Sequence, residues 1–295
     1  MIAKAAYHAD LHAHSIRSDG VHEPSELVRL AAERGVEILA LSDHDTLSGA
    51  AEAIAAGERL GVRVIPSIEL NTESAWGDVH VLGYFLDPND APLEGRLRWL
   101  REHRGRRIEL MVENLSRLGY PVSLERVREI AAGGGGLRPQ GPPPLGRPHL
   151  AQALAEAGHV RSYDEAFETL ISKDSPAYVE RVGLSPSEAT RLIVDHGGAA
   201  SLAHPRTVNG LRRLLPQLVA AGLTGLEVYY PAHAPEWTAE VRALAEAFEL
   251  IPTGGSDFHG RGEHGGPLGC AYVPPNTVPR LEARASRIAA GRRAM

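Results

Sequence analysis

The stretch Asp10-Leu-His-Ala-His-Ser-Ile-Arg-Ser-Asp-Gly20, near the start of the chain, indicates both a fold and a chemistry. Alternate residues of an extended segment point to the same side, so His12 and His14 can bind one ion together. Near the other end of the chain, Gly254-Gly-Ser-Asp-Phe-His-Gly260 repeats this spacing with Asp257 and His259. Both ends of the chain therefore predict a pair of metal ligands.

Metal-capable side chains recur at the ends of predicted strands throughout the sequence. There are nine: His12, His14, Asp19, His44, Glu69, His80, His204, Asp257 and His259. Imidazoles and carboxylates without thiolates favour Zn, Mn or Fe over a structural cysteine-type zinc site. Each residue alone could serve core hydrogen bonding or solvation. Their grouping at short spacing after apolar runs instead favours a centre of two or three ions.

These segments resemble the PHP family, which is named for its polymerase and histidinol-phosphatase members. The resemblance rests on the opening stretch and on Leu41-Ser-Asp-His-Asp-Thr46, Ile68-Glu-Leu-Asn71, Ala203-His-Pro205 and Gly255-Ser-Asp-Phe-His-Gly260. It implies an α/β fold, namely a distorted (β/α)7 barrel of the PHP type with a helical insertion domain. It also implies a trinuclear metal centre and phosphoester hydrolysis.

The resemblance further implies a division of the ligands among three ions. The first would be held by His12, His14, Glu69 and Asp257, the second by Asp19, His44 and His259, and the third by Glu69, His80 and His204, with Glu69 bridging. Some relatives place histidine where this chain has Asp19. Because a carboxylate is a harder ligand, Mn is our first expectation, with Fe or Zn as alternatives.

Composition restricts the class of protein. The chain has 295 residues, 43% of them hydrophobic and 23% charged, which describes a globular protein able to bury a large core. A net charge of −6 argues against bulk attraction to nucleic acid. With Cys270 as the only cysteine, no intrachain disulfide can form. The sequence shows neither a secretory signal nor a membrane span, so we expect a cytoplasmic protein without a membrane or stable protein partner.

Short apolar runs that alternate with helical patterns predict βα units and a parallel sheet. The predicted strands are Val36–Leu41, Val62–Ile68, Val79–Phe85, Ala199–Leu202, Gly225–Tyr229, Leu250–Thr253 and Gly269–Val273. Helices are predicted over Pro24–Arg34 and Leu47–Leu60, each followed by a glycine suited to end it.

The alternation stops in the middle of the chain. Residues 87–180 contain helical patterns at Pro92–Leu118, Leu124–Ala132, His149–Ala157 and Tyr163–Ile171, with a Gly/Pro-rich loop at Gly133–Gly136 and Pro142–Pro144 that should be mobile. We expect a barrel formed by residues 1–86 and 181–295, and a helical cap formed by residues 87–180. The cap would cover the carboxyl ends of the strands, where active sites of β/α barrels form.

Several charged residues are candidates for roles beside the metals. Asp10, Asp43 and Asp45 flank the ligands and could orient imidazoles, although Asp45 could equally cap a helix. The motif Gly146-Arg-Pro-His149 resembles the branch of nucleoside 3′,5′-bisphosphate phosphatases and 5′→3′ exoribonucleases. That resemblance implies phosphate binding by Arg147, Lys173 and Arg206 and a substrate role for His149. We assign catalytic roles to His149, Arg147 and Asp43, and a substrate role to His233 that a plain loop histidine would explain equally well.

A run of arginines occupies the longest predicted helix: Arg96, Arg98, Arg101, Arg104, Arg106 and Arg107. It could follow a nucleic-acid backbone. Glutamates interleave with it, so a solvated helix face with ion pairs is the preferred interpretation.

The expected function is hydrolysis of a phosphate ester in a small 5′-phosphorylated nucleotide, a short 5′-phosphorylated oligoribonucleotide, or both. A nucleoside 3′,5′-bisphosphate would yield a 5′-monophosphate and phosphate. Histidinol-phosphate phosphatase is the alternative enzyme within the family. An amidohydrolase is disfavoured because neither Lys4 nor Lys173 lies at a predicted strand end. A non-catalytic PHP module is disfavoured because degenerate copies lose ligands, and this chain keeps nine.

Overall fold

The computed structural model describes residues 8–132, 145–180, 182–260 and 265–293. Its strands are β1 (Ala9–Ala13), β2 (Ile38–Leu41), β3 (Arg63–Asn71), β4 (His80–Tyr84), β5 (Ala199–Leu202), β6 (Gly225–Tyr229) and β7 (Ile251–Gly254). Its helices are α1 (Pro24–Glu33), α2 (Ala50–Leu60), α3 (Ala91–Arg117), α4 (Leu124–Ala131), α5 (Arg147–Glu156), α6 (Tyr163–Glu168), α7 (Pro186–Asp195), the 3₁₀ helix η1 (Pro205–Thr207), α8 (Leu211–Ala220), α9 (Pro235–Ala247) and α10 (Thr277–Arg293).

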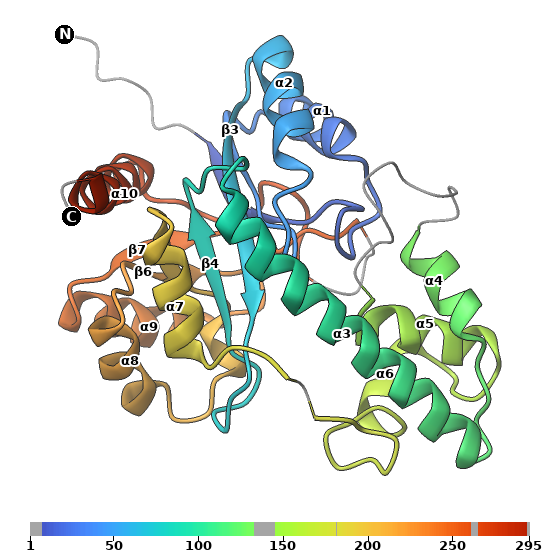
Figure 1. Ribbon diagram of the computed structural model, residues 1–295. Helices are drawn as coiled ribbons and strands as arrows, with labels where there is room; N and C mark the ends of the chain where they lie inside the picture. The colour runs from blue at the N-terminus through green and yellow to red at the C-terminus, as the bar shows by residue number, and fades with distance from the viewer. Residues whose placement is uncertain (1–7, 133–144, 181, 261–264, 294–295) are drawn as a thin grey trace, which may run out of the picture.

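The seven strands form one sheet in chain order, β1 to β7. A parallel bridge between Ala13 and Phe258 joins the two edges, so the sheet curves into a nearly closed barrel. Tyr84 of β4 is fully buried, and its hydroxyl donates a hydrogen bond to the carbonyl of Leu11 in β1 at 3.1 Å. Helices cover the outside of the sheet (Figure 1). The expected α/β fold, a distorted barrel, is confirmed.

One strand runs against the predicted direction. β4 pairs antiparallel with both β3 and β5, whereas the other neighbours are parallel. The connection between β3 and β4, residues 72–79, is shorter than the roughly dozen residues that a parallel crossover needs. The expectation of an all-parallel sheet is therefore wrong at β4. The reversal brings His80, the first residue of β4, opposite Asn71 at the end of β3.

The last predicted strand, Gly269–Val273, is also wrong, because these residues form turns and irregular backbone. Gly269 has a φ of +78°, which a strand does not allow. Its N–H donates to the Asp10 carboxylate at 2.7 Å instead of to a neighbouring strand. The other predicted strands correspond to β2–β7.

Helix α3 runs from the barrel to a group of helices, α4–α6, that lies to one side (Figure 1). Buried side chains of these helices form a hydrophobic cluster of their own, which includes Ile108, Met111, Val127, Leu150 and Leu154. The predicted helices of this region match α3–α6, with α6 ending earlier than expected. The Gly/Pro-rich loop predicted at Gly133–Gly136 and Pro142–Pro144 lies outside the described residues.

Candidate metal centre

His12 and His14 lie at the end of β1 and face the same group of carboxylates. The Nε2 atoms of both rings lie 3.2 Å from Glu69 Oε2. They lie 3.3 and 3.1 Å, respectively, from Asp257 Oδ1. These four buried residues can therefore converge on one ion, and they are the set expected for the first metal.

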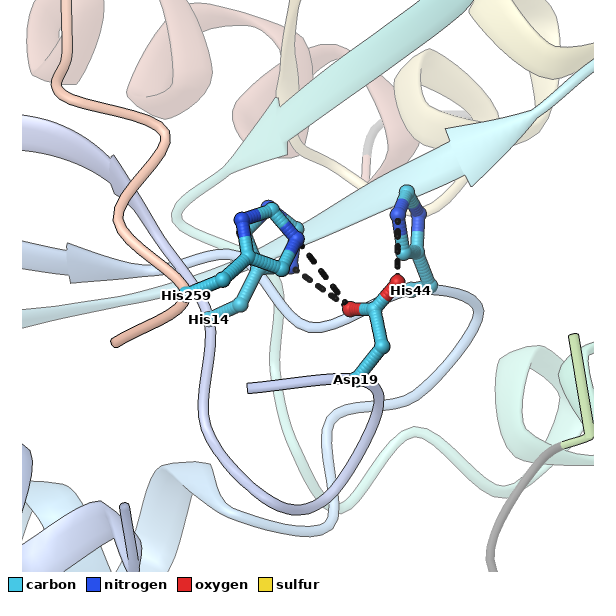
Figure 2. A group of neighbouring side chains, drawn as sticks. All are labelled: His14, Asp19, His44 and His259. Atoms are coloured by element: carbon cyan, nitrogen blue, oxygen red, sulfur yellow. Dashed lines mark ion pairs between the residues drawn. The ribbon is translucent and has the colours of Figure 1, made fainter. Parts of the chain in front are cut away.

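A second group surrounds Asp19, which lies in the loop after β1 (Figure 2). Asp19 Oδ1 lies 3.3 Å from His259 Nε2 and 3.8 Å from His14 Nδ1. Its other oxygen lies 3.6 Å from His44 Nε2. His14 faces both groups, with its Nδ1 atom toward Asp19 and its Nε2 atom toward Glu69 and Asp257, so it lies between two neighbouring candidate cation sites.

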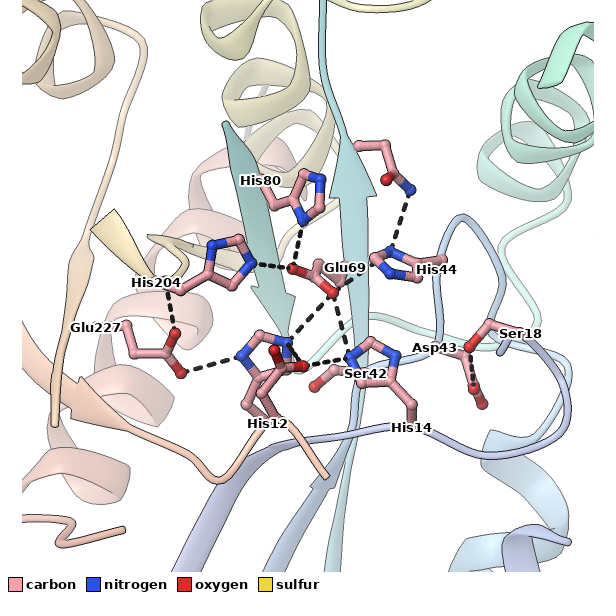
Figure 3. A network of polar contacts seen from close by, with 12 residues as sticks. His12, His14, Ser18, Ser42, Asp43, His44, Glu69, His80, His204 and Glu227 are labelled. Carbon is pink, nitrogen blue, oxygen red and sulfur yellow. Dashed lines mark hydrogen bonds and ion pairs between the residues drawn. The ribbon is translucent and has the colours of Figure 1, made fainter. Parts of the chain in front are cut away.

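Glu69, at the carboxyl half of β3, is the centre of the whole cluster (Figure 3). Its Oε1 lies 2.9 Å from His80 Nδ1 and 3.0 Å from His204 Nε2. Its Oε2 lies 3.3 Å from His44 Nδ1. A carboxylate with imidazoles on both oxygens can bridge ions, as the sequence resemblance implies.

The backbone conformation directs these side chains toward the mouth of the barrel. His204 and Asp257 have positive φ values of 23° and 53°, which non-glycine residues rarely adopt. Such conformations persist where the surrounding structure holds them, and they concentrate at functional sites. Gly255 approaches β1 so closely that a Cβ there would lie 2.2 Å from His12 Cβ. The segment after β7 therefore needs glycine to bring Asp257 beside His12.

The carboxylates and imidazoles strongly perturb one another's pKa values. Burial raises the pKa of Glu69, but His44, His12 and His80 outweigh burial and hold it well below its usual value. Burial lowers the pKa of His14, but Asp257 and Glu69 outweigh this and raise it to about 10. For His44 burial prevails and lowers the pKa to about 3. A divalent ion bound at His14 would therefore compete with a proton for that ring.

The chemistry of the donor set fits divalent ions. Several buried ring nitrogens and one carboxylate oxygen have no hydrogen-bond partner in the described part of the chain: His12 Nε2, His14 Nδ1, His14 Nε2, His80 Nε2 and Asp19 Oδ1. Buried polar atoms are nearly always satisfied, so such a concentration indicates ligands that await a cation. Imidazole and carboxylate donors suit Zn, Mn or Fe.

Glu227 is a site residue that the sequence reasoning missed. It is fully buried in β6, and its Oε1 lies 3.0 Å from His12 Nδ1, while its Oε2 accepts the backbone N–H of His204 at 2.6 Å. Glu227 therefore orients the ring of His12 and the loop that carries His204. A glutamate within the apolar run Leu226-Glu-Val228 was the available signal, because charged residues are almost never fully buried unless paired.

Tyr230 was also missed, and it lies next to the ligands. Its hydroxyl donates to Asp257 Oδ2 at 2.9 Å and thereby fixes that carboxylate. Burial, together with the nearby charge of Asp257, raises its pKa, so Tyr230 stays protonated as a donor.

The three aspartates next to the ligands orient backbone and loops. Asp10 accepts the N–H groups of His12, Ser256 and Gly269. Asp43 accepts hydrogen bonds from Ser15 and Ser18 and lies to one side of the ligands, next to Ser18 (Figure 3). Asp45, at a φ of 55°, binds Asn71, whose amide nitrogen lies 3.1 Å from His44 Nδ1. Within the described part of the chain, none of these aspartates forms a hydrogen bond to an imidazole, and the contacts of Asp43 favour a positioning role over the catalytic one.

A cleft of about 610 Å³ opens over the ligand cluster and separates it from α5 and α6. Its basic lining consists of Arg104, Arg107, Arg147 and Arg206. Of the residues expected on the substrate side, the structure thus brings Arg147 and Arg206 to the cleft.

The other three residues expected on the substrate side do not line the cleft. His149 is 1% exposed, and its Nδ1 accepts the N–H of Gly146 at the start of α5, so it caps a helix. Lys173 is exposed. His233 is buried with Nδ1 against the carbonyl of Val228, and burial lowers its pKa. Positions for these side chains depend on long-range packing, which a motif does not encode.

The arginine run on α3 also departs from the solvated face that we expected. Arg104 and Arg107 are only 8% and 4% exposed and face the cleft. Arg104 donates to Asp45 at 3.1 Å, and Arg107 donates to the carbonyl of Val179 at 2.6 Å. Arg106, in contrast, is exposed and paired with Glu109, as predicted for the run. Of the arginines in this run, Arg104 and Arg107 are the two that line the cleft.

A barrel mouth with clustered imidazoles and carboxylates, facing a cleft lined by arginines, is the architecture of a metal-dependent hydrolase acting on phosphate esters. The family model of the PHP domain matches residues 10–124. The 3′,5′-nucleoside bisphosphate phosphatase of Chromobacterium violaceum is 33% identical over 94% of this chain and 98% of its own length. This chain belongs to the PHP family and is a metal-dependent phosphoesterase.

Other relatives and a solved structure also match most of the chain. A phosphoribosyl 1,2-cyclic phosphate 1,2-diphosphodiesterase of Eggerthella lenta is 33% identical over 85% of this chain and 94% of its own. A 5′–3′ exoribonuclease of Escherichia coli is 30% identical over 85% and 84%. A solved structure from Bifidobacterium adolescentis, described as a metal-dependent phosphoesterase, superposes with a TM-score of 0.83, 31% identity and coverage of 96% and 98%. No helix in the described ranges is long and apolar enough to cross a membrane.

Proposed function

We propose that this protein hydrolyses the 3′-phosphate ester of nucleoside 3′,5′-bisphosphates, the terminal ester of short 5′-phosphorylated oligoribonucleotides, or both. One observation carries the proposal: the cleft over the metal-ligand cluster is also lined by four arginines. Guanidinium groups bind phosphate through paired hydrogen bonds. A single cleft can therefore bind two phosphates, one at the cluster and one at the arginines. The phosphatase and exoribonuclease relatives act on substrates of this kind, by their names.

The ions would be divided as the resemblance implies. The first is assigned to His12, His14, Glu69 and Asp257, the second to Asp19, His44 and His259, and the third to Glu69, His80 and His204. The clusters around Asp257 and Asp19 support the first two sets, and the contacts of Glu69 with His80 and His204 support the third. Mn is the proposed metal, since Asp19 gives the second site a carboxylate in place of an imidazole. When bound, divalent ions would activate water and offset the charge of the phosphate ester.

Three further residues would position the substrate and the metal ligands. Arg147 has no ion-pair partner among the described residues, so its charge is available to a phosphate. Arg206 donates to the carbonyl of Ala232, which aims its guanidinium along the cleft wall. Glu227 holds the Nδ1 side of His12 and thereby leaves Nε2 directed at the cluster.

We also propose that residues 87–180 act as a cap on a barrel of residues 1–86 and 181–295. The separate hydrophobic cluster of this segment supports the division. Three of the four cleft arginines, Arg104, Arg107 and Arg147, come from it. The barrel would then supply the reaction chemistry and the cap the specificity. A substrate without the second phosphate would leave the guanidinium of Arg147 without a charged partner, and a polar site discriminates strongly when such a partner is missing.

The first test is phosphate release by the Mn-supplemented protein. Its substrates are adenosine 3′,5′-bisphosphate, adenosine 3′-monophosphate, histidinol phosphate, a ribose 1,2-cyclic phosphate and a short 5′-phosphorylated RNA. We expect release from the bisphosphate or the RNA and little from the 3′-monophosphate. Turnover of histidinol phosphate or the cyclic phosphate alone would refute the proposed substrate class. No turnover at all with bound metal would favour a non-catalytic module.

The phosphate anchor is tested by Arg147→Met. A lost charge-assisted contact should raise KM for the bisphosphate by about 10- to 100-fold. The residual rate on adenosine 3′-monophosphate should not change, because that substrate has no 5′-phosphate to bind. Arg161→Met is the matched control, since Arg161 is 92% exposed in the same helical region. Equal losses on both substrates would show that Arg147 supports the fold instead of the 5′-phosphate.

A further inference from the structure

The wall of the cleft opposite the metal ligands has a different chemistry from the rest. It is formed by α5 and α6, and α6 contributes the aromatic rings of Tyr163 and Phe167. These residues are four positions apart and therefore lie on one face of α6. Their ring centroids are 5.1 Å apart, with an angle of 47° between the planes. Both side chains are partly exposed, although both also pack on the hydrophobic cluster of the cap.

The hydrophobic cluster of the cap contacts only one side of the Tyr163 and Phe167 pair. The rings also line the cleft, where phosphate chemistry has no need of an aromatic group. Aromatic rings in a basic groove are a common surface for stacking nucleobases, and every base offers a π face. The guanidinium of Arg147 lies 5.4 Å from the centroid of Phe167. A phosphate held by Arg147 would therefore lie beside the aromatic pair.

The charges along the cleft also favour placing the base, and not a phosphate, at the aromatic end. Asp164, on the same helix, lines the aromatic end and is exposed, and none of the described residues forms an ion pair with it. Its carboxylate repels a phosphate from that end. The arginines and the cations at the cluster attract phosphates to the rest of the cleft. The neutral part of a nucleotide, its base, is the group that suits the end with Tyr163 and Phe167.

We propose that Tyr163 and Phe167 form a nucleobase-stacking subsite, which makes the enzyme prefer phosphate esters that carry a base over esters with the same phosphates on a bare sugar. The proposal rests on the proposed function for the positions of the two phosphates. It adds a recognition element for the base, a group that neither the metals nor the arginines contact.

The test compares adenosine 3′,5′-bisphosphate with base-free 1-deoxyribose 3,5-bisphosphate. Wild type should prefer the adenosine compound by about 5- to 100-fold in kcat/KM. Tyr163→Leu and Phe167→Leu keep apolar bulk on α6 and should reduce this preference, mainly through KM for the adenosine compound. Activity on the base-free compound should fall less than activity on the adenosine compound. Tyr120→Leu is the control, because Tyr120 is an exposed cap residue away from the cleft.

Binding measurements separate this proposal from the proposed function. Calorimetry of wild type with adenosine 5′-monophosphate and with ribose 5-phosphate reports stacking without hydrolysis. If neither bisphosphate is hydrolysed, yet the adenosine compound binds more tightly and the Leu variants remove the difference, the subsite stands and the proposed reaction falls. Equal affinity of wild type for the two monophosphates overturns the subsite. Equal losses on base-bearing and base-free ligands in the Leu variants also overturn it, because they indicate a purely structural role.

Discussion

At the scale of the residue, the metal cluster depends on partners that hold its ligands as much as on the ligands. Glu69 contacts imidazoles through both of its oxygens, and no other carboxylate in the described cluster does so as extensively. Glu227 lies at the Nδ1 edge of His12, whose Nε2 atom faces Glu69, and it joins His12 to the loop of His204. Through these two contacts, Glu227 connects a ligand of the first candidate ion site with the loop that carries a ligand of the third.

Glu227→Gln tests this linking role. An amide keeps the size of the side chain but weakens its hold on His12 Nδ1 and on the His204 N–H. We expect metal affinity to fall by about 10- to 100-fold, as is common when a residue that orients a metal ligand is lost. Titration with Mn, followed by calorimetry, measures this effect. Glu246→Gln, on the exposed face of α9, is the matched control. Unchanged affinity together with a lower midpoint of urea unfolding would show that Glu227 serves stability alone.

At the scale of the element, α3 connects the barrel to the cap. Its first turn is anchored at the barrel by Asp90, the N-cap residue, which accepts the N–H of Leu93 at 3.0 Å. The second oxygen of Asp90 lies 2.7 Å from His196 Nδ1 after α7. Further along, α3 presents Arg104 and Arg107 to the cleft. The angle at which α3 leaves the barrel therefore influences where the arginines lie.

Asp90→Ala should lower the free energy of unfolding by about 1 kcal/mol through the lost cap. Burial raises the pKa of Asp90, but the hydrogen bonds from His196 and Leu93 outweigh this and hold the pKa below its usual value. A depressed pKa in the folded state means that the contribution is complete above the unfolded value of about 4 and is lost as the pH falls through the folded value.

Urea unfolding at neutral and acidic pH measures this dependence. The difference between wild type and Asp90→Ala should be largest near neutral pH and smaller at acidic pH. Asp174→Ala, at an exposed position in the cap, should show no such difference. A difference that does not change with pH would indicate that the Asp90 carboxylate contributes only as a neutral hydrogen-bond acceptor.

At the scale of the whole molecule, the barrel brings together ligands from both ends of the chain. His12 and Asp257 are neighbours because the segment after β7 returns to β1, where the Asp257 N–H donates to the His12 carbonyl at 2.8 Å. An ion shared by these residues would therefore join the first and last strands, where hydrogen bonding between the two edges is sparse.

Removal of the metals should consequently destabilise the barrel as a whole. Binding to the folded state alone adds about 2.7 kcal/mol when the free ion is at 100 times its Kd. We expect a chelator to lower Tm by several degrees, and Mn to restore it in a concentration-dependent way. Differential scanning fluorimetry measures both effects. The same Tm with chelator and with Mn would mean that the ions do not contribute to closing the barrel.

The sequence by itself determined the family, the α/β barrel and the candidate ligands of its centre. It could do so because metal ligands are identified by residue type and by short spacings, such as His12 with His14, that alternate along a strand. Only the tertiary structure decided the direction of β4, the burial of His149, and the role of Glu227. Only it showed that Arg104 and Arg107 face the cleft. These features depend on which segments pack together across long separations in the chain, and local sequence patterns carry no information about such contacts.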